Sequence, residues 1–182
     1  MNILIIDNVS YLSDVIEYEA QKYGMICTKI NDFSEINELK FTSIDVIISL
    51  IGNDLEEFQI NQRVIGFAES FRTKFLLISS FGCGDSWLNL SLKAKKLFGL
   101  KVRFKTLSEE WLKSSQLNWK IIRPVGLTRE KVEGDLSFNN EYIGNGKYIN
   151  IYDFAGFLVK VIINNNWVEG TLHYAYMVPK KD

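Results

Sequence analysis

Short runs of apolar residues alternate along this chain with longer segments in which apolar residues recur every three or four positions. The short runs are typical of buried strands, and the periodic segments are typical of amphipathic helices. The pattern predicts strands over residues 2–6, 25–30, 44–51, 74–79, 119–123 and 170–178. It predicts helices over 10–23, 55–71 and 151–163, and a helical stretch over 88–115 that is interrupted near Gly99.

This alternation of strands and helices predicts an α/β fold. A parallel, doubly wound, Rossmann-like sheet would carry helices on both faces and form three layers. No internal repeat or linker divides the 182 residues, so we expect a single domain over 1–182. The segment 126–147 is expected to be irregular, with a turn at Asn145-Gly146 that suits a small hairpin.

Composition narrows the classes of partner. The 21 basic and 22 acidic side chains leave a net charge of −1, which argues against nucleic acid or an anionic membrane as a partner. No apolar run approaches the roughly 20 residues that span a bilayer, and no export signal is recognisable. The two cysteines, Cys27 and Cys83, fit neither a metal site nor a disulfide framework. We therefore expect a cytoplasmic protein without a metal.

The candidate chemistry lies at the carboxyl ends of the predicted strands, where doubly wound sheets bind ligands. Ser79 and Ser80 lead from a buried strand into a loop that contains Gly82 and Gly84. Their hydroxyls suit a hydrogen bond to a substrate carbonyl, and glycines allow close approach of a ligand to the backbone. A plain turn that ends the strand fits these residue types equally well. The Arg123-Pro124 segment ends a later strand, and taken alone it is interpreted as a plain strand end.

Five segments in chain order resemble the atypical short-chain dehydrogenase/reductases, in particular the NmrA-like and biliverdin/flavin reductase-like NAD(P)H-binding proteins. The segments are D-V-I-I-S-L-I-G at 45–52, L-L-I-S-S-F-G at 76–82, K-x-x-x-E-x-x-L at 105–112, L-N-W-K-I-I-R-P-V-G-L at 117–127 and Y-I-N-I-Y-D-F-A-G-F-L at 148–158. The resemblance covers nearly the whole chain. It implies a Rossmann sheet that binds NAD or NADP.

The resemblance also implies roles for individual residues. Ser79 or Ser80 matches the serine that polarises the substrate carbonyl, and Lys105 matches the lysine that contacts the nicotinamide ribose. The family's catalytic tyrosine stands four residues before that lysine, where this chain has Lys101. Another group must then protonate the product, and water or Tyr142 are candidates. Further cofactor contacts are expected at the strand ends, from Ser49, Gly52, Arg123 and Pro124.

The opening turn departs from the family pattern. The family's G-x-x-G-x-x-G aligns with Asp7, Ser10 and Ser13, so three side chains occupy the space that glycines leave open. A carboxylate about 4 Å from a pyrophosphate charge would be repelled by roughly 4 kcal/mol at an effective dielectric of 20. The two serine hydroxyls and the helix N-terminus favour an anion and offset this in part.

The choice between NAD and NADP stays open at this level. Asp32 stands about where a carboxylate binds the adenosine ribose of NAD, although a solvated turn is the preferred interpretation. No arginine stands there to bind the 2′-phosphate of NADP. If a cofactor binds, NAD is at least as well supported as NADP.

Three functions are compatible with these patterns. The first is an NAD(P)H-dependent reductase or isomerase of a small molecule. The second is a non-catalytic Rossmann descendant that senses a ligand or pairs with a protein, because the three glycines and the tyrosine are absent. The third is a protein that uses the pocket at the opening turn to bind a neutral or cationic ligand instead of a dinucleotide. A homodimer or another protein partner is compatible with the first two.

Overall fold

The computed structural model describes residues 1–8, 10–32, 34, 43–142, 148–164 and 167–178. The strands are β1 (Asn2–Ile6), β2 (Ile26–Ile30), β3 (Val46–Ser49), β4 (Lys74–Ile78), β5 (Trp119–Pro124), β6 (Gly126–Thr128), β7 (Asp135–Asn139), β8 (Tyr148–Asn150) and β9 (Thr171–Val178). The helices are α1 (Tyr11–Gln21), α2 (Leu55–Phe71), α3 (Leu92–Lys113) and α4 (Ile151–Ile163), with a short 3₁₀ helix at Gly84–Asn89. The predicted turn at Asn145-Gly146 lies outside the described residues.

The main sheet confirms the predicted doubly wound fold. Its strand order is β2-β1-β3-β4-β5-β9-β7, and all neighbours are parallel except β7, which runs antiparallel to β9. That edge strand lies in the segment that was predicted to be irregular, and so does β6, which pairs with β8 in a separate two-stranded sheet. Gly134 precedes β7 with a φ of +125°, and a Cβ there would lie 2.4 Å from the Val178 carbonyl oxygen. The close approach of β7 to β9 therefore requires glycine at this position.

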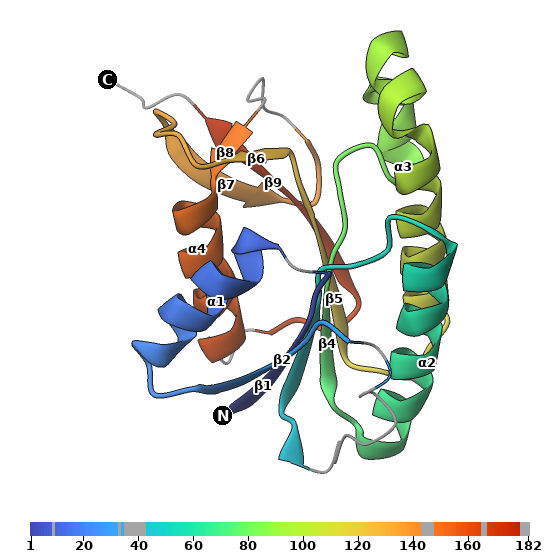
Figure 1. Ribbon diagram of the computed structural model, residues 1–182. Helices are drawn as coiled ribbons and strands as arrows, with labels where there is room; N and C mark the ends of the chain where they lie inside the picture. Colours follow the sequence, from blue (N-terminus) through green and yellow to red (C-terminus); the bar gives the residue numbers. More distant parts are fainter. Residues whose placement is uncertain (9, 33, 35–42, 143–147, 165–166, 179–182) are drawn as a thin grey trace.

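Two helices cover each face of the sheet (Figure 1). On β1, Ile3 and Ile5 belong to the core under α1 and α4, whereas Leu4 and Ile6 belong to the core under α2 and α3. A strand buried on both faces must be apolar at consecutive positions, which explains the continuous runs in the sequence. The strand order reverses between β1 and β3, so the carboxyl ends of these strands flank the switch point of the fold.

Helix α3 is continuous, so the predicted interruption at Gly99 is wrong. A glycine in a helix interior costs only about 1 kcal/mol relative to alanine. The side chain of Ser91 caps the helix by accepting a hydrogen bond from the amide of Ala94. In the described part of the chain, neither α3 nor any other helix combines the length and apolar character needed to cross a bilayer.

A buried ion pair fixes α3 to the sheet. The Arg123 guanidinium on β5 donates to both carboxylate oxygens of Glu109 on α3, at 2.9 and 2.6 Å. The two side chains are only 2% and 1% exposed. Arg123 also donates to Asp85 at 2.6 Å and to the Tyr174 hydroxyl at 2.7 Å. Burial alone would lower the pKa of Arg123, but Glu109 and Asp85 together raise it, so the guanidinium stays charged.

We expect Glu109→Ala to lower the free energy of unfolding by about 3–5 kcal/mol, because it leaves a buried guanidinium without its main partner. Asp85→Ala is the matched control. It removes a partner of the same arginine whose side chain is 83% exposed, so its cost should stay below about 1 kcal/mol. Urea unfolding followed by circular dichroism measures both values. Equal losses in the two variants would show that the buried pair does not anchor α3.

Candidate functional site

The switch point brings together several of the predicted site residues. Lys105 on α3 lies close enough to Asp7 and Glu57 for their charges to act on its ammonium group. A Cβ on Gly52 would lie 3.5 Å from Cγ of Lys105. The Lys105 ammonium also donates to the carbonyl of Ile78, the last residue of β4, at 3.2 Å. The ends of β1, β3 and β4 therefore meet around one lysine.

The opening turn is closed by its own carboxylate. Asp7 is 3% exposed, and its Oδ2 accepts hydrogen bonds from the Ser10 amide at 2.7 Å and the Ser10 hydroxyl at 2.6 Å. The Ser13 hydroxyl donates to the Ser10 carbonyl at 2.8 Å. Asp7 thus places a negative charge at the N-terminus of α1, where a helix favours an anion. The two serine hydroxyls, expected to serve a phosphate, both donate within the turn instead.

A second carboxylate fills the facing loop between β3 and α2. Glu57 is 3% exposed and accepts from the amides of Gly52 at 2.7 Å and Asn53 at 2.6 Å. The side chain of Asn8 donates to Glu57 at 3.1 Å and so links the two loops. Burial would raise the pKa of Glu57, but the hydrogen bonds from Asn53, Asn8 and Gly52 hold it below its ordinary value. Sequence reasoning missed Glu57, although the D-x-x-E spacing from Asp54 was a visible capping signal.

Ser49 lies beneath this edge rather than on it. Its side chain is fully buried, and its hydroxyl donates to the side-chain oxygen of Asn61 on α2 at 2.6 Å. The Asn61 amide donates in turn to the Ser108 hydroxyl on α3 at 3.3 Å. This chain of hydrogen bonds ties β3, α2 and α3 together. The burial argues against the predicted contact between Ser49 and a cofactor.

Ser79 stands out among the predicted catalytic residues. It is 4% exposed, and its hydroxyl forms no well-aligned hydrogen bond with a described residue, although it lies near enough to the Cys83 thiol to act on the pKa of that group. The neighbouring Ser80 hydroxyl donates to the Phe81 carbonyl at 3.2 Å. An unsatisfied buried hydroxyl costs roughly 1–3 kcal/mol, so a position that keeps one is a candidate ligand contact. The structure therefore favours Ser79 over Ser80.

Lys105 lies beside Ser79, because the carbonyl that it contacts belongs to the preceding residue, Ile78. Burial lowers the pKa of Lys105, while Cys83, Glu57, Glu109 and Asp7 act in the opposite direction. The Cys83 thiol is fully buried, and burial raises its pKa, so it has little thiolate character. The serine and lysine that the family resemblance implies are thus neighbours in the structure.

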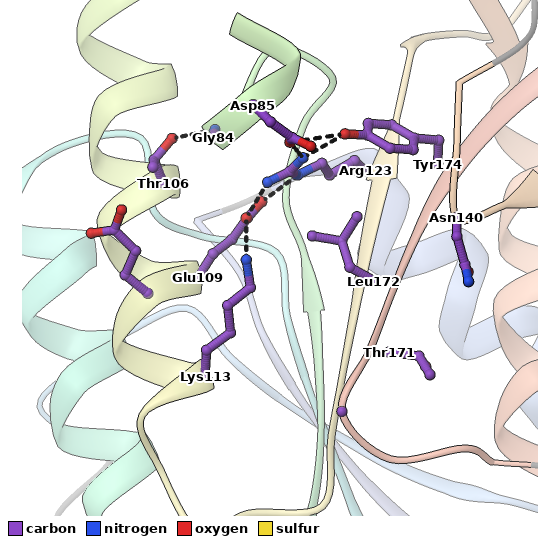
Figure 2. Close-up of a pocket in the computed structure, with 12 residues that line it drawn as sticks. Gly84, Asp85, Thr106, Glu109, Lys113, Arg123, Asn140, Thr171, Leu172 and Tyr174 are labelled. Carbon is purple, nitrogen blue, oxygen red and sulfur yellow. Dashed lines mark hydrogen bonds and ion pairs between the residues drawn. The ribbon is translucent and has the colours of Figure 1, made fainter.

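Arg123 is committed to the ion pair described above. Figure 2 shows its guanidinium between Glu109 on one side and Asp85 and Tyr174 on the other. This network lines a pocket of about 490 Å³ that also borders Lys113. With donors already directed to three partners, Arg123 has a structural role, and its predicted contact with a cofactor stays a prediction.

The two remaining predicted contacts lie at other strand ends. Pro124 is buried, and its carbonyl accepts from the Phe81 amide at 2.9 Å. Asp32 follows β2 at the surface and accepts from the amide and hydroxyl of Ser34 at 3.0 and 2.8 Å. These hydrogen bonds lower the pKa of Asp32. The role of Asp32 at an adenosine ribose stays a prediction.

An aromatic group follows the serine loop. The ring of Phe81 lies 4.5 Å from that of Tyr142 and 6.2 Å from that of Tyr174, measured between centroids. Tyr142 also packs edge-on against Tyr176 at 5.1 Å. Burial raises the pKa of Tyr142, so its hydroxyl is protonated at neutral pH. The sequence made Tyr142 a candidate proton donor. Its ring lies against that of Phe81, the residue after Ser80.

A cation that sequence reasoning missed lies at the start of α1. The guanidinium carbon of Arg129 is 3.8 Å from the ring centroid of Tyr11, the first residue of the helix. The Tyr11 hydroxyl is hydrogen-bonded to that of Tyr152 on α4. No carboxylate forms an ion pair with Arg129 in the part of the chain that the structure describes. The cation therefore remains available to an anion near the opening turn.

Comparison with solved structures agrees with the fold. The anaerobillin reductase ChuY from Escherichia coli is 23% identical, with full coverage of both chains and a TM-score of 0.81. The oxidoreductase YlbE from Lactococcus lactis is 15% identical, with 99% and 92% coverage and a TM-score of 0.78. A short-chain dehydrogenase/reductase from Veillonella parvula in complex with NADP is 10% identical, with 97% and 94% coverage and a TM-score of 0.72. These likenesses show the fold alone.

Sequence comparison identifies the family. No curated protein matches the chain. A family model described as NAD(P)H-binding matches residues 14–165, which begin directly after the turn that lacks glycines. Because this match spans most of the sequence, the chain belongs to the NAD(P)H-binding family of Rossmann-fold proteins.

Proposed function

We propose that the protein is an NAD(P)H-dependent reductase of a small, planar molecule. The observation that carries this proposal is the Ser79 hydroxyl, which is buried without a partner beside Lys105 at the carboxyl edge of the sheet. Membership of the NAD(P)H-binding family supports the cofactor, and the likeness to a protein named as a reductase supports the reaction type.

The cofactor fits the two ends of the site unequally. At the reacting end, Lys105 would hold the nicotinamide ribose beside Ser79. At the phosphate end, the Ser10 amide is already bound by Asp7, and the Gly52 amide by Glu57. The positive charge has to come from elsewhere, and Arg129, which stacks on the ring of Tyr11 at the start of α1, would supply it. Its guanidinium would hold the pyrophosphate outside the closed turn.

When bound, the cofactor supplies a hydride. The Ser79 hydroxyl would donate a hydrogen bond to the substrate oxygen on which negative charge develops. Tyr142 would donate a proton to that oxygen and regain one from solvent, because its hydroxyl stays protonated at neutral pH. The rings of Phe81 and Tyr142 offer an aromatic surface for a flat substrate. This assignment replaces the family tyrosine, whose position holds Lys101.

The second candidate is a non-catalytic descendant that no longer binds a dinucleotide. The observation that favours it is that both loops at the switch point are satisfied by their own carboxylates, Asp7 and Glu57. Such loops are stable without a bound phosphate. The two candidates differ in whether a dinucleotide binds, so a titration separates them.

We expect NADH or NADPH to quench the tryptophan fluorescence of the protein in a saturable manner. Asp7→Gly should strengthen this binding by about tenfold or more, since it removes the carboxylate and frees the Ser10 amide. Asp14→Ala is the control, because it removes an acidic side chain of α1 that is 61% exposed. A flat titration with both cofactors, in the wild type and in Asp7→Gly, would favour the non-catalytic candidate.

The same titration tests the two cations. Arg129→Ala and Lys105→Ala should each weaken cofactor binding, since the first removes a charge near the phosphates and the second removes a hydrogen-bond donor at the ribose. Lys131→Ala removes an exposed charge two residues beyond Arg129 and should leave the affinity unchanged. Unchanged affinity in Lys105→Ala would show that the family role does not carry over to this lysine.

Ser79→Ala should lower the rate of NADPH oxidation with menadione, a planar quinone, by about a hundredfold. It should also raise the free energy of unfolding, by up to about 1–3 kcal/mol, because it removes an unsatisfied buried hydroxyl. Ser80→Ala is the control and should change neither quantity strongly. A Ser79→Ala variant that turns over normally and unfolds more easily would assign Ser79 a purely structural role.

A further inference from the structure

The pocket beside Arg123 lies on the flank of the sheet, between α3 and the start of β9. Its volume of about 490 Å³ is within the range of small-molecule sites. The carboxyl-terminal half of α3 borders it on one side, and Thr171 and Leu172 border it on the sheet side. Dinucleotides bind at the carboxyl ends of the strands, whereas this pocket extends toward the amino-terminal end of β9. It is therefore separate from the candidate cofactor site.

Four side chains of alternating charge form a row along this pocket: Asp85, Arg123, Glu109 and Lys113 (Figure 2). Nη1 of Arg123 lies 2.6 Å from Oδ1 of Asp85, and Nη2 lies 2.6 Å from Oε2 of Glu109. Nζ of Lys113 is 3.6 Å from the same oxygen of Glu109, which is beyond ordinary hydrogen-bond distance. The two middle groups are buried and satisfy each other, so the ends of the row are a carboxylate and an ammonium group.

Both ends of the row have unused hydrogen-bonding capacity. Among the described residues, Arg123, Tyr174 and the Ser86 amide all donate to Oδ1 of Asp85, and no donor reaches its Oδ2. The hydrogen bond from Arg123 lowers the pKa of Asp85, so this carboxylate is charged at neutral pH. The Lys113 side chain is 40% exposed, and its only ion pair with a described residue is the long contact with Glu109. A ligand can therefore pair with a negative group at one end and a positive group at the other.

The surface between these ends is neutral. In Figure 2, Leu172 stands between Lys113 on α3 and Asn140, which follows β7. Leu172 is partly buried and offers apolar surface to the pocket. Asn140 is exposed, and its amide forms no hydrogen bond with a described residue. The middle of a ligand would thus contact an apolar side chain, with an uncharged amide beside it.

We propose that this pocket binds a small zwitterion whose ammonium and carboxylate groups are joined by a short aliphatic chain. The ammonium would face Asp85 and the carboxylate would face Lys113, so each end of the row meets its opposite charge. Because Arg123 and Glu109 separate the two ends, the charges of the ligand have to be several bonds apart. This favours an ω-amino acid over an α-amino acid. The inference goes beyond the proposed function, since binding here requires neither a cofactor nor a reduction.

Titration with δ-aminovalerate, followed by NMR of the backbone amides, tests the proposal. We expect saturable shifts at Asp85, Lys113 and Leu172, with a Kd of about 1 mM or lower. Pentylamine and valerate each carry one of the two charges on a chain of the same length. Each should bind about tenfold more weakly or worse, because one end of the row stays unpaired. The protein is titrated without a dinucleotide, so the result does not depend on the proposed function.

Asp85→Asn and Lys113→Gln test the two ends of the row separately. Each removes one charge with little change in shape, and each should weaken the binding of δ-aminovalerate by about fivefold or more. Asp135→Asn and Lys96→Gln are the matched controls, because each removes an exposed charge of the same sign that does not line the pocket. Both controls should bind as the wild type does. Circular dichroism confirms that the four variants are folded.

Three results would overturn the inference. The first is a wild-type protein that shows no saturable shift at about ten times the expected Kd. The second is pentylamine that binds as tightly as δ-aminovalerate, which would make the pocket a site for cations alone. The third is a set of shifts centred on Ser79 and Lys105, which would assign the zwitterion to the carboxyl edge of the sheet.

Discussion

The bidentate pair between Arg123 and Glu109 sets the position of α3, and much of the site depends on that helix. Two buried charges are costly to desolvate, and only good geometry and further hydrogen bonds offset the cost. Here the arginine reaches Glu109 through two donors and Asp85 and Tyr174 through a third. The pair therefore fixes both the rotation and the height of α3 against β5.

The Arg123–Glu109 pair also determines which side of α3 faces the sheet. One turn before Glu109, Lys105 faces the end of β4, where its ammonium meets the Ile78 carbonyl next to Ser79. Residues four apart lie on the same face of a helix, so the anchor and the lysine are placed together. Leu100 lies on the other side of the helix and is 71% exposed.

The fold was readable from the sequence, because buried parallel strands need continuous apolar runs such as 46–48 and 75–78. The antiparallel β7 was missed although its side chains alternate as in a half-buried strand, because the stretch has only five residues and its partner β9 lies more than 30 residues away in the chain. The site was predictable in part. Ser79 and Lys105 followed from a family resemblance. Arg129 was missed because its contact with Tyr11 joins segments far apart in the sequence.

The role of Asp7 in the structure differs from the role that the sequence predicted. The sequence suggested a carboxylate that opposes a phosphate, whereas the structure shows a carboxylate that replaces one by accepting from the helix N-terminus. A dinucleotide would then have to bind beyond this turn, with a separate cation for its phosphates.

The Ser79 hydroxyl differs from the other buried polar groups at this edge of the sheet. At the switch point, Asp7 and Glu57 are each held by several donors, and even Ser49 beneath them is paired. The other buried side-chain atoms without partners among the described residues belong to Asn118, Trp167 and His173, and they lie toward the amino-terminal ends of β5 and β9, away from this edge. An edge that satisfies its other polar groups but leaves one hydroxyl unpaired forgoes roughly 1–3 kcal/mol of stability. Such a cost at the residue beside Lys105 is what a substrate contact would require, whereas the opening turn keeps no free donor of this kind.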